Sequence, residues 1–303
     1  MSNDRLQGVF AATLTPLYDS DALQPDGYMK YLSLLAQRGC HGALIMGTTG
    51  EGPSLSVRER IELMHLTMNF RESNPDFRLL AGTGTPSLTE TIELTRIAFE
   101  LDFDAVVVLP PYYFRSAKED GLFAWFQSLI EAAVPSGRSL LGYHIPAVSG
   151  VALNISLLER LRHAFGDRFA GVKDSSGDRD HARQLEKHFG AEFKVFTGND
   201  RLLSHALKHS ASGCITAMAS LASPDLRLVW DAHLAGGEDE KAQTRLQEAR
   251  SELEKYGPFP PSLKGLMHRL HDLPRWYVRP PLVELSQVEI ESAAPFFDTP
   301  RHV

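Results

Sequence analysis

The chain has 303 residues, of which 43% are hydrophobic and 23% are charged. This composition is ordinary for a globular protein and excludes disordered, collagen-like and fibrous classes, while the length suits one α/β barrel with an appendage or two modest domains. The 38 acidic residues outnumber the 31 basic residues and give a net charge of −7, which argues against a protein that binds nucleic acid or a membrane surface.

A short apolar run, a loop rich in glycine or proline and an amphipathic helix recur along the chain. Runs this short, bounded by turn residues, predict strands that are buried on both faces. The eight runs lie at 9–14, 43–46, 79–81, 105–109, 140–143, 169–172, 193–196 and 214–217. Four serine–glutamate pairs fit the capping box that begins a helix, namely Ser56 with Glu59, Ser87 with Glu90, Ser116 with Glu119 and Ser156 with Glu159.

Eight strands alternating with helices favour the α/β class and a closed (β/α)8 TIM barrel. An open doubly wound sheet is the alternative, but no G-x-G-x-x-G turn opens a helix here. From Pro224 onward the pattern is helical, over 226–234, 238–255, 263–270 and 286–294. We therefore predict a barrel over 1–223 that carries the active site and a small C-terminal helical domain over 224–303.

Neither the cysteines nor the apolar runs indicate an extracellular or membrane protein. Cys40 and Cys214 are too few for a disulfide framework and lie in apolar segments, so we expect two reduced core thiols. The first residues lack the apolar stretch of a signal peptide, and no run reaches the roughly 18 apolar residues of a membrane span. A cytoplasmic location is expected.

Candidate catalytic residues follow from the rule that reactive groups of a barrel lie at the carboxyl ends of its strands. Lys173 directly follows the run 169–172, and burial there favours the neutral amine, a nucleophile that can form a Schiff base with a ketone. The alternative is an ion pair with Asp174 or Glu51. Tyr143, at the end of the run 140–143, could relay a proton or could be an amphipathic core residue.

Two further groups of polar residues are candidates for a ligand site or a metal site. The loop 47–51 offers several backbone N–H groups and two hydroxyls, which suits a carboxylate, although an ordinary turn is the alternative. Among twelve histidines, His205 with His209 and His268 with His271 have helical spacing. No H-E-x-x-H motif or nearby cysteine accompanies them, so we expect solvated helix faces and no metal.

Four ordered motifs resemble one superfamily: GTTGE at 47–51, PYY at 111–113, YHIP at 143–146 and GVKD at 171–174. They resemble the class I pyruvate lyases, which include dihydrodipicolinate synthase, N-acetylneuraminate lyase and 2-keto-3-deoxygluconate aldolase. The resemblance implies a pyruvate Schiff base on Lys173, proton relay by Tyr143, and binding of the carboxylate and support of the relay by Thr48 and Thr49. It implies no metal or nucleotide cofactor.

The same resemblance implies a homo-oligomer, a dimer of dimers, because Tyr113 matches a tyrosine that reaches into a neighbouring subunit's site. It also implies further contacts with the substrate, which would be pyruvate with an aldehyde, or a 2-keto acid. These contacts fall on Gly47, Gly198, Asp200, Ile215 and Val148.

Departures from each relative narrow the expected substrate. Val148 stands where synthases of the lysine pathway carry an arginine that grips a carboxylate, and an apolar side chain cannot replace that cation. Sialic acid lyases pair aspartate with glutamate after strand seven, whereas Asp200 is followed here by Arg201. A 2-keto-3-deoxy sugar acid aldolase fits better, and Arg115 and Arg201 could meet an anionic acceptor or lie in solvent.

Other functions remain open at this point. The same imine could serve a sugar-acid dehydratase or a hydratase–aldolase, or the chain could be like dihydrodipicolinate synthase or N-acetylneuraminate lyase after all. An inactive ligand-sensing relative is the non-enzyme alternative, against which the intact Lys173, Tyr143 and Thr49 argue. His144 replaces the asparagine usual at its position, and no role follows from the sequence.

Overall fold

The computed structural model describes residues 6–19 and 22–298. Eight parallel strands close into a barrel in sequence order, with β1 paired to β8, which confirms the predicted TIM barrel. Each predicted run overlaps one strand. The strands are β1 (Gly8–Ala12), β2 (Gly42–Ile45), β3 (Arg78–Gly82), β4 (Ala105–Val108), β5 (Ser139–His144), β6 (Phe169–Asp174), β7 (Lys194–Thr197) and β8 (Gly213–Thr216).

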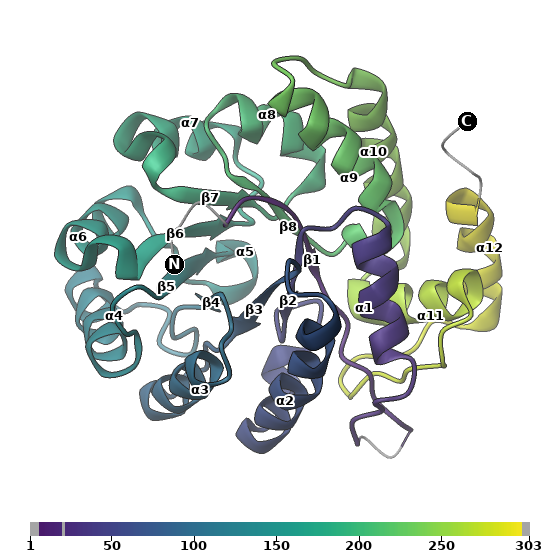
Figure 1. The fold of residues 1–303 in the computed structure, drawn as a ribbon, viewed down its shortest axis with the longest axis horizontal. Coiled ribbons are helices and arrows are strands. Elements are labelled where there is room, and N and C mark those ends of the chain that lie inside the picture. Colours follow the sequence, from purple (N-terminus) through teal and green to yellow (C-terminus); the bar gives the residue numbers. More distant parts are fainter. Residues whose placement is uncertain (1–5, 20–21, 299–303) are drawn as a thin grey trace.

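Helices surround the barrel and cover its outer face (Figure 1). Those up to β8 are α1 (Tyr28–Gln37), α2 (Val57–Ser73), α3 (Leu88–Glu100), α4 (Glu119–Ala133), α5 (Pro146–Ser149), α6 (Ile155–Phe165), α7 (Arg179–Phe189) and α8 (Leu203–Lys208). They are followed by α9 (Ala219–Leu234), α10 (Glu240–Leu253), α11 (Phe259–His271) and α12 (Gln287–Asp298). Short 3-10 turns are at Gly52–Ser54, Gly166–Arg168, Gly190–Glu192, Asp200–Leu202 and Glu254–Tyr256.

The strands are apolar on both faces because each face packs against a separate core. Inside the barrel, Phe10 and Phe196 meet edge to face at 5.4 Å, with Leu44 and Leu141 in the same cluster. A second, larger cluster fills the space between the strands and the helices. Burial on both sides explains why these strands read as continuous apolar runs rather than alternating ones.

Two of the four predicted capping boxes begin a helix. Ser56 and Glu59 form the reciprocal box at α2, and the Ser87 side chain accepts a hydrogen bond from the Glu90 backbone at α3. The predictions for Ser116 and Ser156 are wrong, because α4 begins at Glu119 itself after Lys118 and α6 is capped by Asn154.

A long-range interaction accounts for both wrong predictions. The Glu119 carboxylate accepts hydrogen bonds from Ser156 at 3.1 Å and from Arg160 at 2.7 Å. Glu119 therefore joins α4 to α6 instead of capping its own helix, and the Ser156 hydroxyl is used in the same bond.

The predicted boundary between residues 223 and 224 falls inside α9. This helix begins at Ala219 and has a non-helical residue at Ala222, and it packs against β1. Helices α11 and α12 lie outside the ring of barrel helices, beside α1 and α10 (Figure 1). The four predicted C-terminal helices correspond to α9–α12, and the division into two domains stays a prediction.

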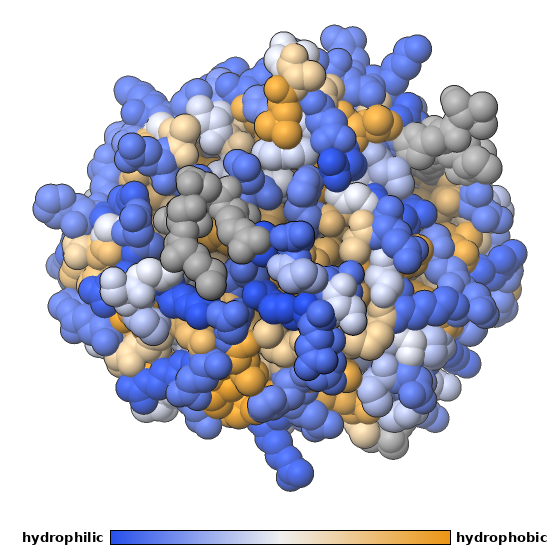
Figure 2. All heavy atoms as spheres, viewed as in Figure 1, coloured by the Kyte–Doolittle hydropathy of each residue, from blue (hydrophilic) through white to orange (hydrophobic). Residues whose placement is uncertain are grey.

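The surface and the core agree with the composition. Polar and charged side chains cover most of the face seen in Figure 2, where apolar residues form small separate areas. Cys40 and Cys214 are buried free thiols, and burial raises the pKa of Cys40 to about 12. Within residues 6–19 and 22–298, no helix has both the length and the apolar character needed to cross a membrane.

A buried ion pair fastens the loop after β2 to the C-terminal helices. Lys264 of α11 donates to the Glu51 carboxylate at 2.5 Å, and both side chains are 1% exposed. The second carboxylate oxygen accepts from the backbone N–H of Arg279 at 3.0 Å, and Lys264 also donates to the Tyr277 carbonyl. The pair therefore fixes Glu51, which lies two residues after Thr49 in the loop.

We expect Lys264→Met to lower the free energy of unfolding by about 3–5 kcal/mol, because it leaves the Glu51 carboxylate buried without its cation. The double variant Lys264→Met/Glu51→Gln should recover part of this loss, since no charge is then stranded. Urea unfolding measures both. Lys255→Met, which breaks an exposed pair with Glu252, is the control and should change stability little. A double variant no more stable than Lys264→Met would contradict the interpretation.

Candidate active site

Lys173 and Tyr143 lie side by side at the carboxyl ends of neighbouring strands. They are paired in the register of β5 and β6, and they are 3% and 6% exposed. The Lys173 ammonium nitrogen is 4.2 Å from the centre of the Tyr143 ring, within the range of a cation–π contact. The two groups that imine chemistry requires are thus buried together.

The carboxylates that could neutralise Lys173 are bound elsewhere. Glu51 pairs with Lys264, and Asp174 accepts a hydrogen bond from His181 Nδ1 at 3.0 Å. Among the described residues, no carboxylate forms an ion pair with Lys173. The alternative prediction, an ion pair of Lys173 with Asp174 or Glu51, is therefore wrong.

The Tyr143 hydroxyl is set up to lose and regain a proton. It lies 3.3 Å from the Thr48 hydroxyl. Burial alone would raise the pKa of Tyr143, but the Lys173 charge and hydrogen bonds from Thr48, Ser175 and Lys173 outweigh burial and hold it below the ordinary value of a tyrosine. A tyrosine with a lowered pKa is a better proton relay near neutral pH.

The loop after β2 has the shape of an anion site. Met46 and Glu51 both have positive φ, 56° and 53°, a backbone conformation that costs energy for residues other than glycine. The loop closes through hydrogen bonds from the N–H groups of Gly50 and Gly52 to the Gly47 carbonyl, both 3.1 Å. A Cβ at position 52 would lie 2.1 Å from the Met46 carbonyl oxygen, so the turn requires glycine there.

The N–H groups of Thr48 and Thr49 remain available in this loop. Neither has a backbone or side-chain acceptor within the described part of the chain. Thr49 is buried and Thr48 is exposed, and the Thr48 hydroxyl reaches Tyr143. Adjacent N–H donors and hydroxyls next to the reactive pair can bind a carboxylate.

Two residues of this site were not found from the sequence. Ser175 follows Lys173 by two positions, and its hydroxyl contacts Tyr143 and lies against Gly198. Arg60 of α2 lines the same cavity as Thr48 and Tyr143. Its buried guanidinium donates to the backbone carbonyls of residues 52, 55 and 84. These hydrogen bonds join the segment after β2 to the loop after β3. In the sequence, the only indication of a role for Ser175 is that it directly follows the GVKD motif.

The structure places Asp200 and Arg201 in contacts with the C-terminal helices. Asp200 is fully buried and accepts from the Thr216 hydroxyl at 2.5 Å and from Arg250 at 3.1 Å. Arg201 pairs with Glu254 at 2.6 Å. The structure does not bring these side chains together with Lys173, and substrate contact by Asp200 stays a prediction.

The remaining predicted residues lie around the mouth or inside the barrel. Val148, in the short helix α5, is 60% exposed. Ile215 of β8 is buried in the interior cluster that includes Tyr143. Tyr113 is 77% exposed and packs edge to face against the exposed Phe114. Arg115 is exposed and lies against Gly150, at the end of α5.

His144 lies behind the reactive pair rather than in it. Its ring is 4.6 Å from that of His181, and its Nδ1 accepts a hydrogen bond from the Leu153 backbone at 3.0 Å. Burial, followed by the nearby His181, lowers the pKa of His144 to about 4 although Asp174 raises it. Burial alone would raise the pKa of Asp174, but His181 and the Ser176 backbone hold it below its usual value.

Comparison with known proteins shows the family of the chain. Residues 5–295 match the dihydrodipicolinate synthetase family. A protein of Chloroflexus aurantiacus, described as an uncharacterized DapA-like lyase, is 39% identical over 94% of this chain and 93% of its own length.

Two solved structures share the fold. One is Ruminococcus gnavus sialic acid aldolase, a catalytic lysine mutant, with a TM-score of 0.89 and 22% identity over 98% of this chain and 97% of that chain. The other is YagE of E. coli K12, a prophage protein of the dihydrodipicolinic acid synthase family in complex with pyruvate, with a TM-score of 0.88 and 23% identity over 95% of this chain and 96% of that chain. The chain therefore belongs to the dihydrodipicolinate synthetase family and is an enzyme of the lyase class.

Proposed function

We propose that this protein is a class I pyruvate-dependent aldolase that cleaves or forms a 4-hydroxy-2-keto acid, such as a 2-keto-3-deoxy sugar acid, through a Schiff base on Lys173. The observation that carries the proposal is the buried Lys173 beside Tyr143, with no carboxylate paired to the lysine among the described residues. The free N–H groups of Thr48 and Thr49 supply the adjoining site for the carboxylate of the keto acid.

In the cleavage direction, the Lys173 amine attacks C2 of the keto acid, and water leaves as the iminium forms. The Tyr143 oxygen takes the proton of the C4 hydroxyl while the C3–C4 bond breaks, and the bonding electrons pass into the iminium to give an enamine. The aldehyde departs, Tyr143 returns the proton to C3 of the enamine, and water hydrolyses the imine to release pyruvate and restore Lys173. Thr48 and Thr49 hold the carboxylate throughout. This chemistry needs no metal or nucleotide cofactor.

The surroundings of the pair favour a short acceptor without a second carboxylate or an extended polyol. Val148 offers no charge at the mouth, and Asp200 and Arg201 are bound to Arg250 and Glu254. Arg115 lies against Gly150, at the end of α5. A small aldehyde such as that released from a 2-keto-3-deoxy sugar acid suits this mouth better than sialic acid or aspartate semialdehyde.

The assembly that we propose is a homo-oligomer, a dimer of dimers. Tyr113 and Phe114 expose large aromatic surfaces, 77% and 73%, next to the barrel mouth. Aromatic side chains are enriched in the cores of protein–protein interfaces. Burial of this pair against a second copy would place Tyr113 near the site of its neighbour.

Turnover of candidate substrates tests the proposed function. We expect release of pyruvate from 2-keto-3-deoxygluconate and little release from N-acetylneuraminate. Pyruvate is measured by a coupled assay with lactate dehydrogenase. Lys173→Ala should abolish release, whereas Lys194→Ala, a partly exposed lysine at the start of β7, should retain it. Turnover confined to N-acetylneuraminate, condensation with aspartate semialdehyde, or a dehydrated product without free pyruvate would contradict the substrate class.

Replacement of the relay hydroxyl tests the role of Tyr143. Tyr143→Phe should lower kcat by about 10²–10⁴-fold, the usual contribution of a positioned acid–base group, with a smaller change in KM because Thr48 and Thr49 remain. Since the pKa of Tyr143 lies below its ordinary value, ultraviolet titration should show one tyrosinate forming below pH about 10 that is missing from the variant. An unchanged kcat would exclude the relay.

A further inference from the structure

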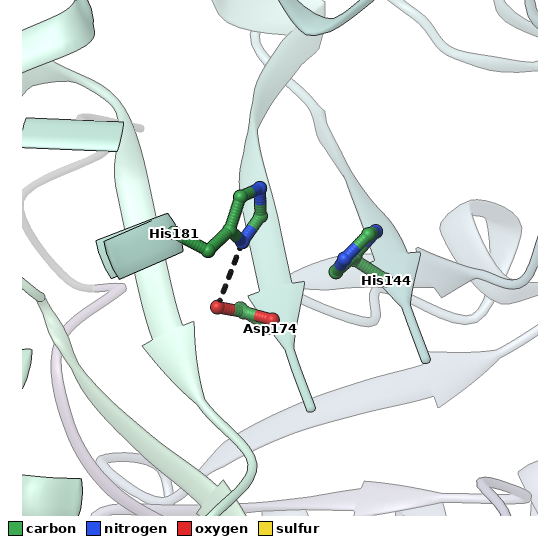
Figure 3. Close-up of side chains that lie close together, drawn as sticks. All are labelled: His144, Asp174 and His181. Carbon is green, nitrogen blue, oxygen red and sulfur yellow. Dashed lines mark hydrogen bonds and ion pairs between the residues drawn. The ribbon is translucent and has the colours of Figure 1, made fainter. Parts of the chain in front are cut away.

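A second cluster of reactive side chains lies one residue beyond the Lys173–Tyr143 pair on the same two strands. His144 ends β5, Asp174 ends β6, and His181 comes from α7, and all three are buried, with exposures of 6%, 8% and 9% (Figure 3). Side chains alternate along a strand, so His144 and Asp174 face the helix layer while Tyr143 and Lys173 face the barrel interior. The cluster is therefore separate from the site proposed for pyruvate.

The hydrogen bonds of the cluster leave nitrogen atoms free. His144 Nδ1 accepts from the Leu153 N–H and so carries no proton, which leaves Nε2 on its other side. His181 Nδ1 is bonded to Asp174 Oδ2, and His181 Nε2 is buried with no hydrogen-bond partner among the described residues. Nε2 lies on the side of the ring that faces away from Asp174 (Figure 3), so an ion shared with Asp174 would bind His181 through Nδ1 and would replace the proton of that hydrogen bond.

The donor atoms fit a divalent transition metal. One nitrogen from each ring and one carboxylate oxygen lie within 4.8 Å of one another, and no other group of this kind occurs in the described residues. Zinc binds imidazole and carboxylate ligands at about 2.0–2.2 Å, so ligand atoms around it are separated by about 3.5 Å. Side-chain movements of about an ångström would close the site, and a fourth position would remain for water.

We propose that His144, Asp174 and His181 form a binding site for a divalent transition-metal ion of the zinc type, which would join the ends of β5 and β6 to α7. Two imidazole nitrogens and one carboxylate oxygen supply three donor atoms in a buried place. The ion would lie behind Lys173 and would not contact the keto acid. Its role is to stabilise the strand ends that carry the reactive pair, and the site does not depend on which substrate is cleaved.

Titration of chelator-treated protein with Zn²⁺ alone tests this site by calorimetry and by the shift in Tm. We expect one ion per chain and a higher Tm with Zn²⁺, because a ligand that binds only the folded state stabilises it. His181→Ala and Asp174→Asn should weaken binding about 100-fold or more and abolish the shift. The control is His205→Ala, which alters another close histidine pair, with rings 4.7 Å apart, and should leave binding unchanged.

Co²⁺ provides a readout that needs no variant. The visible absorption of Co²⁺ bound to the unaltered protein should show the intense bands of a four-coordinate site with nitrogen and oxygen ligands, and Zn²⁺ should displace it. The absence of binding, a six-coordinate spectrum, or affinity unchanged in His181→Ala would overturn the proposal. Activity enters neither measurement, so the result is independent of the proposed aldolase reaction.

Discussion

A lysine buried at the mouth of the barrel, with no carboxylate paired to it among the described residues, is the constraint around which this structure is arranged. The two acids considered as partners for it are bound elsewhere, Glu51 to Lys264 and Asp174 to His181. The Tyr143 ring and hydroxyl lie beside Lys173. The lack of a paired carboxylate in the described part of the chain makes the amine a candidate nucleophile rather than half of a salt bridge.

The C-terminal helices take part in the site without contacting its centre. Lys264 of α11 holds Glu51, and Arg250 of α10 holds Asp200 at the start of the turn after β7. Arg279 reaches Glu59 at the first turn of α2, which lies directly behind the loop of Thr48 and Thr49. Loops at the end of a barrel are otherwise free to move, so these ion pairs hold the loops after β2 and β7 in place.

The fold was predictable because its signals are local. Each apolar run marks a strand whose two faces are both buried. Where a predicted run and its strand begin or end at different residues, they differ by one or two positions. The start of a helix was less secure: Ser116 and Ser156 fit a capping pattern, but Glu119 binds Arg160 of another helix. Local spacing cannot show whether a side chain is claimed by a distant residue.

The same limit explains the outcome for the site. Lys173, Tyr143, Thr48 and Thr49 come together because strand ends meet at one rim of the barrel, which the order of the runs already implied. Other contacts depend on how the helices pack, and residue spacing does not predict them. Asp200 pairs with Arg250 of α10, and Arg201 pairs with Glu254 in the turn after α10. The ring of His181 likewise approaches that of His144. His144 and His181 come from a strand and a helix that are distant in sequence, so helical spacing does not reveal that their rings lie close together.

Covalent trapping of pyruvate on Lys173 tests the central claim most directly. The protein is incubated with pyruvate and borohydride, and the intact mass and the modified peptide are determined beside Lys173→Ala and Lys194→Ala. Imine formation at Lys173 predicts a stable pyruvyl adduct on the unaltered chain and on Lys194→Ala, located at residue 173, and none on Lys173→Ala. A folded, unaltered protein without an adduct, or an adduct that persists in Lys173→Ala, would contradict the account.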